Sequence, residues 1–247
     1  MTPILELQDL SFRYEGGLPG EKVLDALTFA VAPGERVGLV GCNGVGKSTL
    51  LKILVGILPI QTGALTVGGL PMERKNLAEI RRKVGYIFQD SDSQLFMPTV
   101  RADVAFAAEN YGYPPEEVAA RTRRALTAVH MEHCADRPVY RLSGGQKKLA
   151  SIAGILTLDP ALILMDEPSA ALDPRNRRAL IGILNALPCA KLIASHDLDF
   201  IYYTCDRVLL LHHGQLAADG PAREILCDKT LLEKCELELP LRWQRDF

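Results

Sequence analysis

A glycine-rich stretch near the beginning of the chain has the residue types and spacing of a phosphate-binding loop. It matches the pattern G-x-x-x-x-G-K-[ST] and consists of Gly41, Cys42, Asn43, Gly44, Val45, Gly46, Lys47, Ser48 and Thr49. The glycines allow the backbone to fold around a phosphate group without Cβ clashes, and Lys47 adds a mobile cation. The hydroxyl of Ser48 is placed to coordinate Mg²⁺. The alternative is a glycine turn before an ordinary helix, and the complete motif argues against it.

An acidic pair follows an apolar run in the second half of the chain. The run Ala161–Met165 ends in Asp166 and Glu167. A carboxylate at the end of a buried strand is costly unless it meets a cation or strong hydrogen-bond donors, so we assign Asp166 to the Mg²⁺ shell. Glu167 is then positioned at the end of the site that takes the γ-phosphate.

A second anion-binding feature lies between these two motifs, in the pentapeptide Leu142, Ser143, Gly144, Gly145, Gln146. Ser143 predicts a helix N-cap, and the two glycines expose N–H groups at the start of a helix from about Gln146 to Leu156. Because the phosphate loop is already complete, a second helix end on the same nucleotide would be redundant.

The three motifs in this order resemble the ATP-binding cassette (ABC) ATPase family, and the resemblance covers nearly the whole chain. It implies hydrolysis of ATP to ADP and phosphate with Mg²⁺, and it makes Glu167 the base that polarises the attacking water. It also implies that residues 142–146 complete the site of an opposing protomer, so that two cassettes enclose two ATP molecules. Since every motif is intact, a homodimer of this chain would have two competent sites.

The same resemblance assigns four further residues to the site. Gln89 matches the family glutamine that senses Mg²⁺ and the attacking water, which makes it a predicted metal ligand as well. His196 matches the histidine that contacts the γ-phosphate, and Tyr14 matches the aromatic residue that stacks on adenine. Asp173 resembles the residue in the loop that links the two sites. The predicted catalytic residues are thus Lys47, Gln89, Glu167 and His196.

The elements that must position these residues follow an α/β pattern. Short continuous apolar runs are typical of parallel strands with helices on both faces, and they predict strands at Arg36–Val40, Val84–Phe88, Leu162–Met165, Lys191–Ala194 and Val208–Leu211. A small antiparallel unit is expected at Leu5–Tyr14, Val23–Ala32 and Ala64–Gly69, with turns at Gly16-Gly17 and Gly68-Gly69. Helices are expected at Lys47–Gly56 and through most of Thr99–Ile155.

The resemblance implies the α/β fold of a P-loop NTPase, with a RecA-like core of the ABC type that carries the antiparallel unit and an inserted helical subdomain. We expect a single ABC ATPase domain over residues 1–247. Its nucleotide-binding core would consist of residues 1–90 and 156–220, its helical signature subdomain of residues 91–155, and its C-terminal helix and tail of residues 221–247.

Composition narrows the class of protein further. The formal net charge of −2 and the isoelectric point near 6.2 give no reason to expect a nucleic acid partner. No apolar run approaches the ~20 residues that cross a bilayer, and no secretory signal opens the chain. The six cysteines are scattered without a Cys-x-x-Cys pair, which fits a reducing cytosol. We expect a soluble protein that reaches a membrane only through a partner.

The stretch after Gln89 narrows the resemblance within the family. Residues 92–100, with residues 103–106 and 109–110, look like the ATPase subunits of energy-coupling factor (ECF) importers, and more narrowly like those of cobalt and nickel uptake systems. This implies a short extra helix in that stretch and a groove for the coupling helices of an integral membrane subunit. It also implies a substrate-capture subunit and a position at the cytoplasmic face of the cell membrane. Departures from the common family pattern occur at Cys42, Asp90-Ser91, Leu149 and Ala171, and none of them removes a catalytic group.

Several alternatives stay open. An ECF-type importer of a vitamin such as biotin would carry the same motifs, because this subunit never touches the substrate. A non-transport ABC ATPase that remodels nucleic acid or ribosomes usually has tandem cassettes or long coiled-coil insertions, which this chain lacks. A small-molecule P-loop kinase is disfavoured by residues 142–146 and by His196. Finally, Cys42 lies near a helix N-terminus and Lys47, which are surroundings that activate a thiol, so we expect its alkylation to block ATP binding.

Overall fold

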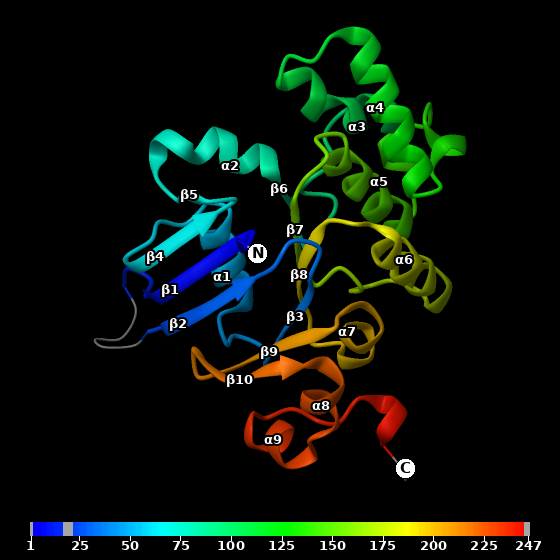
Figure 1. Ribbon diagram of the computed structural model, residues 1–247. Coiled ribbons are helices and arrows are strands. Elements are labelled where there is room, and N and C mark those ends of the chain that lie inside the picture. Colours follow the sequence, from blue (N-terminus) through cyan, green and yellow to red (C-terminus); the bar gives the residue numbers. More distant parts are fainter. Residues whose placement is uncertain (1, 17–21, 245–247) are drawn as a thin grey trace.

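Two β-sheets and a group of helices make up the structure, a computed structural model that describes residues 2–16 and 22–244 (Figure 1). The strands are β1 (Leu5–Phe12), β2 (Leu24–Val31), β3 (Arg36–Val40), β4 (Thr62–Val67), β5 (Leu70–Pro71), β6 (Val84–Ile87), β7 (Leu162–Asp166), β8 (Ala190–Ala194), β9 (Arg207–His212) and β10 (Gln215–Pro221). The α-helices are α1 (Lys47–Leu54), α2 (Leu77–Lys83), α3 (Val100–Asn110), α4 (Pro115–Ala128), α5 (Gly144–Leu156), α6 (Pro174–Ala186), α7 (Leu198–Thr204), α8 (Ala222–Cys227) and α9 (Lys229–Lys234).

The larger sheet brings the predicted site residues to one edge. Its strand order is β10-β9-β3-β8-β7-β6, and every pair except β10–β9 is parallel. The phosphate loop follows β3, the acidic pair ends β7, His196 follows β8 and Gln89 follows β6. Because the carboxyl ends of parallel strands lie at the same edge, four segments far apart in the sequence meet there.

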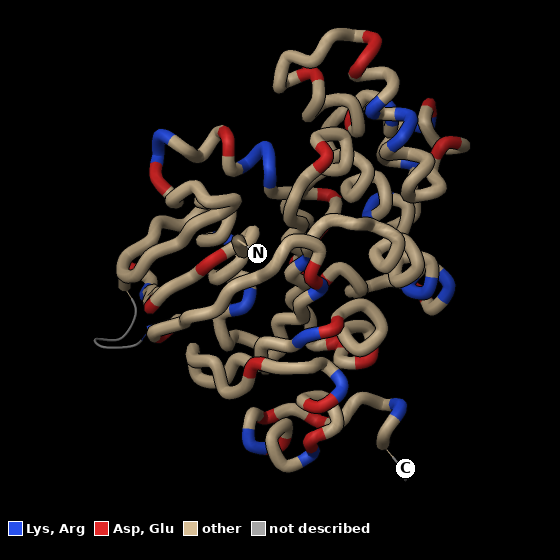
Figure 2. The backbone as a smooth tube through the Cα atoms, viewed as in Figure 1, with Lys and Arg blue, Asp and Glu red and all other residues tan. Residues whose placement is uncertain are grey.

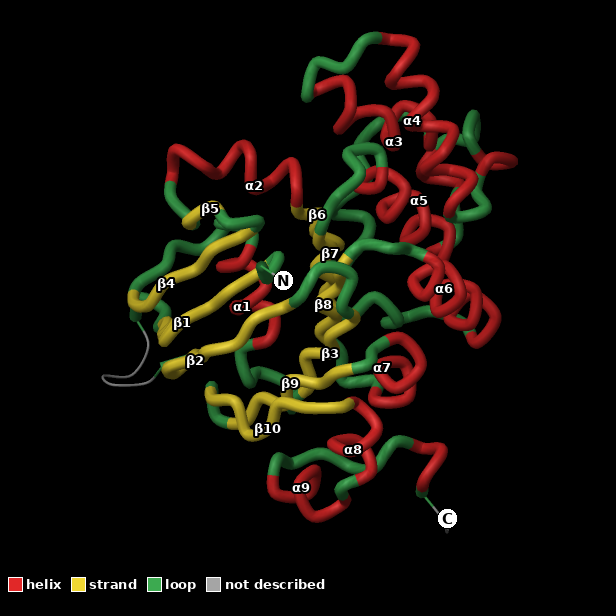
Figure 3. The backbone as a smooth tube through the Cα atoms, in the orientation of Figure 1, coloured by secondary structure: helices red, strands yellow, loops and turns green. Residues whose placement is uncertain are grey.

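The strands of this sheet are buried on both faces, and their side chains alternate between two hydrophobic cores. In β7, Leu162 and Leu164 point into one core, while Ile163 and Met165 point into the other. The second core is closed by helices α5, α6, α7 and α8. The first is closed by α1 together with the smaller sheet, so the expectation of helices on both faces is only half right (Figure 3). The reason is that β1, β2 and β4 each have an apolar face of their own to bury.

The smaller sheet is the predicted antiparallel unit. Its order is β2-β1-β4-β5, and all of its pairs are antiparallel. Gly68 and Gly69, with φ of 56° and 77°, form the turn from β4 to β5 as the sequence predicts. Of the other predicted turn, Gly16 has φ of 87°, whereas Gly17 lies outside the described residues.

Helices α3, α4 and α5 form the helical lobe, which extends away from the smaller sheet in Figure 1. In the stretch for which the resemblance implies a short extra helix, residues 92–99 contain turns and no helix, and α3 follows at Val100–Asn110. Hydrogen bonds hold the loop of residues 90–99 in this conformation. Asp90 accepts from Asp92 N (3.0 Å) and Ser93 Oγ (2.7 Å), and Asp103 on α3 accepts from the backbone N–H groups of Phe96 and Met97 (2.8 and 2.7 Å).

The C-terminal segment, α8, α9 and the residues after them, packs beside α7 and β10 (Figure 1). Trp243 meets the ring of Tyr202 edge-on, with 4.9 Å between the ring centroids. Positively and negatively charged residues occur together in the helical lobe, in the part of the chain that contains the two sheets, and in this C-terminal segment (Figure 2). None of the helices in the described part of the chain has the length and hydropathy needed to span a membrane.

Candidate active site

A cavity of about 380 Å³ lies at the edge where the parallel strands end. Its lining contains most of the predicted site residues from five separate segments. They are Tyr14, Asn43, Gly44, Gly46, Lys47, Ser48, Thr49, Gln89, Glu167 and His196, and Val23 completes the lining. The fold therefore places the proposed adenine, phosphate and γ-phosphate contacts around a single space.

The phosphate loop has a shape that only glycine allows at one position. Gly46 begins α1 with φ of 109°, and a Cβ built there would lie 2.7 Å from Leu24 Cδ2 and 2.9 Å from Val23 O. The loop is thus packed against the start of β2, and Gly46, Lys47, Ser48 and Thr49 at the beginning of α1 line the cavity. Any side chain at position 46 would push the loop out of this shape.

Lys47 lies against the loop it belongs to. Its ammonium group donates to the carbonyl oxygens of Gly41 (2.7 Å) and Cys42 (3.1 Å). Burial lowers the pKa of Lys47, and the nearby carboxylate of Glu167 offsets part of that effect. Gly41, Cys42 and Val45 do not line the cavity, because Val45 is buried in the core and Cys42 packs partly against it. Gly41 and Cys42 instead accept hydrogen bonds from Lys47 through their carbonyl oxygens.

Ser48 and Asp166 bring two side-chain oxygen atoms to one point. Ser48 Oγ donates to Asp166 Oδ1 at 3.0 Å across 118 residues of sequence. Asp166 is buried, and that burial raises its pKa although Ser48 and Lys47 oppose the shift. A hydroxyl and a buried carboxylate that converge beside a phosphate loop fit Mg²⁺, which prefers oxygen ligands and substrate phosphates.

Glu167 is held from three directions. Its carboxylate accepts from Ser195 Oγ (2.9 Å) and from the backbone N–H of His196 (3.0 Å), and His196 Nδ1 lies 2.9 Å from Oε2. Its backbone is in the left-handed region, with φ of 45°, which costs a non-glycine residue about 1–3 kcal/mol. Such strain concentrates at functional sites, where surrounding contacts maintain it.

Tyr14 closes the other end of the cavity. Its ring is partly exposed and meets Phe12 edge-on at 5.0 Å between centroids. Its hydroxyl shares a hydrogen bond of 3.0 Å with Thr49 Oγ1. A half-exposed aromatic ring beside a phosphate loop can stack on a nucleobase.

The pentapeptide 142–146 and Asp173 lie outside the cavity. Ser143 and Gln146 form a capping box at the start of α5, and Asp173 caps α6 by accepting from the backbone N–H groups of Arg175 and Asn176. The two helix ends touch, since a Cβ at Gly145 would lie 2.8 Å from Asn176 Cγ. The chain thus has one phosphate-binding loop in the cavity and a second exposed helix start away from it.

Sequence reasoning missed three groups that support the site. Ser195 is fully buried against Glu167, and Arg177 on α6 makes two hydrogen bonds of 2.8 Å to Asp197, which caps α7 directly after His196. Lys148 on α5 is buried under the loop of Gln89. The neighbours of His196 were a usable signal, but the partners of Arg177 and Lys148 lie 20 and 59 residues away in the sequence.

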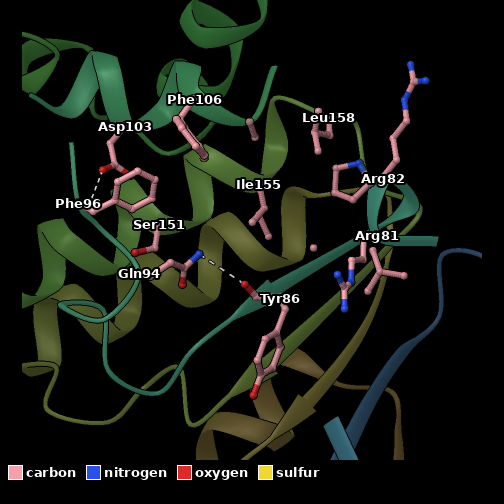
Figure 4. A pocket seen from close by; sticks show the side chains of 15 residues that line it. Arg81, Arg82, Tyr86, Gln94, Phe96, Asp103, Phe106, Ser151, Ile155 and Leu158 are labelled. Carbon is pink, nitrogen blue, oxygen red and sulfur yellow. Dashed lines mark hydrogen bonds between the residues drawn. The ribbon is translucent and has the colours of Figure 1, made fainter. Parts of the chain in front are cut away.

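A groove of about 220 Å³ lies between the helical lobe and β6 (Figure 4). Phe96 and Phe106 stack edge-on at its rim, 4.8 Å apart, and their exposed fractions of 64% and 38% are high for phenylalanine. Arg81 and Arg82 lie on the opposite side, and Ile155 of α5 lies in the floor. Gln94 joins the groove to the loop of Gln89, because it donates to Tyr86 O (3.4 Å) and accepts from Phe88 N (3.2 Å).

Comparisons with known proteins agree with this geometry. The family model described as ABC transporter matches residues 24–170, more than half of the chain. A Geobacter sulfurreducens protein, provisionally named an ABC transporter ATP-binding protein, is 45% identical over 98% of this chain and 96% of its own length. The energy-coupling factor transporter ATP-binding protein of Methanocaldococcus jannaschii is 41% identical over 96% of this chain and 86% of its own length.

Among solved structures, CbiO1 of Clostridium perfringens, described as part of the ABC transporter complex CbiONQ, superimposes with a TM-score of 0.84. It is 34% identical in sequence, and the match covers 94% of each chain. The fold prediction is therefore confirmed. The chain belongs to the ABC transporter family as one of its ATP-hydrolysing subunits.

Proposed function

We propose that this chain is the ATPase subunit of an ECF-type importer at the cytoplasmic face of the cell membrane, with cobalt or nickel ions as cargo. The observation that carries the proposal is the groove beside the loop of Gln89, with two exposed phenylalanine side chains at its rim. Similarity to an energy-coupling factor ATPase and to CbiO1 over nearly the whole chain supports the same branch of the family.

In this proposal the cavity binds Mg-ATP in a fixed orientation. Tyr14 stacks on adenine, and the loop N–H groups with Lys47 hold the β- and γ-phosphates. Ser48, Gln89 and Asp166 hold Mg²⁺, which neutralises charge that develops on the phosphates. Positioning and charge stabilisation supply most of the catalysis in phosphoryl transfer, so the placement of these side chains around one space matters more than any single group.

Glu167 and His196 act on the attacking water and the γ-phosphate. The carboxylate of Glu167 takes up part of the water proton, and it is held for this by Ser195 and the backbone of His196. His196 contacts the γ-phosphate from the neighbouring strand end. Both residues line the cavity opposite the phosphate loop, as that division of roles requires.

The second half of each site comes from another protomer. At the capped start of α5, Ser143 and Gly144 are exposed, Gly145 is buried and Gln146 is half-buried, and all four residues lie outside the chain's own cavity. In a dimer this helix start donates N–H groups to the γ-phosphate bound by the partner. ATP then closes the pair and hydrolysis releases it, which gives a switch biased by a ligand. Asp173 links the two sites, since its helix α6 touches α5 at Gly145.

The groove accepts a coupling helix of the integral membrane subunit. An amphipathic helix would place apolar side chains against Phe96 and Phe106 and acidic or polar ones toward Arg81 and Arg82. The groove shares Gln94 with the loop of Gln89, so a bound helix lies next to the proposed catalytic machinery. A substrate-capture subunit completes the importer and selects the cargo.

Affinity purification from solubilised membranes of the native host tests this proposal. With the chain tagged, mass spectrometry should identify a small integral coupling subunit together with a substrate-capture membrane protein. The capture protein would distinguish a metal importer from an importer of biotin or another vitamin. A conventional pair of permease domains would contradict the ECF branch, and recovery without any membrane protein would favour a non-transport ABC ATPase.

A further inference from the structure

Lys148 has a buried ammonium group that ends on the loop of Gln89. Only 3% of the residue is exposed, although it lies one turn into α5, two residues after the pentapeptide 142–146. Its Nζ donates to Phe88 O and to Gln89 O, both at 2.8 Å. These two carbonyl groups belong to the residues at which β6 ends and the loop begins.

Burying an ammonium group costs desolvation free energy, even when the group donates hydrogen bonds to two carbonyl groups. Burial lowers the pKa of Lys148 to about 8, while Asp90 on the loop and Asp166 on β7 act in the opposite direction. An ammonium donor makes both hydrogen bonds charge-assisted, and such bonds are stronger than those of a neutral donor. Packing alone could have been achieved with an apolar side chain of similar volume.

The face of α5 that carries Lys148 also reaches the membrane-facing groove. Ser151 and Ile155 lie three and seven residues further along the same face, and both line the groove (Figure 4). Ile155 packs directly on β6, since a Cβ at Gly85 would lie 2.6 Å from Ile155 Cδ1. Helix α5 therefore contacts strand β6 through Ile155, and it contacts the residues just after that strand through Lys148.

The neighbouring Lys147 provides a contrast on the same helix. It pairs with Asp92, which is exposed and lies further along the loop, beyond the residues that line the nucleotide cavity. Because the Asp92 side chain is exposed, we expect this pair to contribute little, as surface pairs do, with a typical value of about 0–1 kcal/mol. Two consecutive lysines thus hold the same loop, but only one holds Gln89 itself.

We propose that Lys148 is a positioning residue that fixes Gln89 for hydrolysis and makes catalysis in one cavity depend on the signature helix α5, which serves the nucleotide of the partner. The inference rests on the proposed role of Gln89 at Mg²⁺ and water. When α5 shifts, the two carbonyl groups shift with it, so the side chain of Gln89 moves relative to the phosphate loop. Lys148 touches neither nucleotide and acts only through the loop.

Steady-state ATPase kinetics of the full chain with saturating Mg²⁺ test this inference. Lys148→Met should lower kcat about tenfold and leave KM for ATP within about twofold, because the phosphate loop is untouched. Lys148→Arg, which keeps a charged donor, should recover most of the rate. Lys147→Met is the matched control and should stay within about twofold of the wild type in kcat.

A double-mutant cycle with Gln89→Ala separates positioning from general destabilisation. If Lys148 acts through Gln89, adding Lys148→Met to Gln89→Ala should lower kcat by less than about twofold further. Additive losses, or a wild-type rate in Lys148→Met, would overturn the inference and leave the proposed function intact. A wild-type rate in Gln89→Ala would overturn both. Lys148→Gln, which keeps a neutral donor, replaces Lys148→Met in the cycle if the thermal unfolding midpoint of that variant falls.

Discussion

Glu167 illustrates how much of this site is decided at the scale of one residue. Its carboxylate accepts hydrogen bonds from Ser195 and His196, and its backbone adopts a left-handed conformation that only surrounding contacts can maintain. The residue before it, Asp166, is turned toward Ser48 instead. Two adjacent carboxylates therefore face different partners, which fits one metal ligand and one base.

The substitution Glu167→Gln tests the assignment of Glu167 as the base. Glutamine keeps the size and the hydrogen-bonding reach of the side chain but removes its ability to take up a proton. Phosphate release should fall by about 10²-fold, while the Kd for ATP, measured by equilibrium binding, stays near that of the wild type. Glu79→Gln, on the exposed surface of α2, is the control and should keep full activity. Normal turnover in Glu167→Gln would remove the residue from its proposed role.

Cys42 is a second residue whose chemistry reports on the loop. Its carbonyl holds Lys47, and its side chain packs partly against the core, so a bulky adduct there should distort the phosphate loop. Alkylation with N-ethylmaleimide should abolish ATP binding, and Mg-ATP should slow the reaction. Cys227 is exposed at the end of α8 and serves as an internal control. Equal labelling rates at Cys42 with and without Mg-ATP, measured by peptide mass spectrometry, would refute this.

At the scale of elements, the site depends on strand ends that the sequence makes easy to find. The apolar runs of β3, β6, β7, β8 and β9 were predicted to within two residues of their observed bounds. Helix α6 was not predicted, although Asp173 and Pro174 form a recognisable start and Leu180, Ile183 and Leu184 give it an apolar stripe. A short extra helix was expected somewhere in residues 92–110, where the helix is α3; before it, hydrogen bonds accepted by Asp90 and Asp103 favour turns.

At the scale of elements, the groove leads to a prediction about binding of the membrane subunit. Phe96→Asp or Phe106→Asp should abolish copurification of the membrane subunit, because a carboxylate at the rim would be buried without a partner when a helix docks. The ATPase activity of the isolated chain should not change, since neither residue lines the nucleotide cavity. Tyr111→Asp, at an exposed aromatic position that caps the C-terminus of α3 and lies outside the groove, is the matched control. Unchanged copurification in both phenylalanine variants would exclude the groove as the docking site.

At the scale of the whole molecule, the site combines residues from local sequence motifs with residues whose contacts are long-range in the sequence. The phosphate loop, the acidic pair and residues 142–146 were predictable because each motif is complete within a few neighbouring residues. Lys148, Ser195 and Arg177 were missed because their roles arise only when the lobe, the strand ends and α6 come together. For Ser195 the adjacent His196 was a usable signal, but no periodicity or spacing in the sequence indicates the contacts of Lys148 and Arg177. Their partners become evident only in the folded chain.

The central claim is that the cavity of one protomer is completed by the pentapeptide of another. Ser143 and Gly144 at the start of α5 are exposed and lie outside the cavity, so they can meet a second copy. Sedimentation velocity with Mg-ATP tests this most directly in the slow variant Glu167→Gln, which should form a dimer that dissociates when ATP is removed. Glu167→Gln combined with Ser143→Arg should bind ATP with the same Kd and stay monomeric. A dimer that forms equally well with Ser143→Arg, or no dimer at all in Glu167→Gln with ATP bound, would contradict the account.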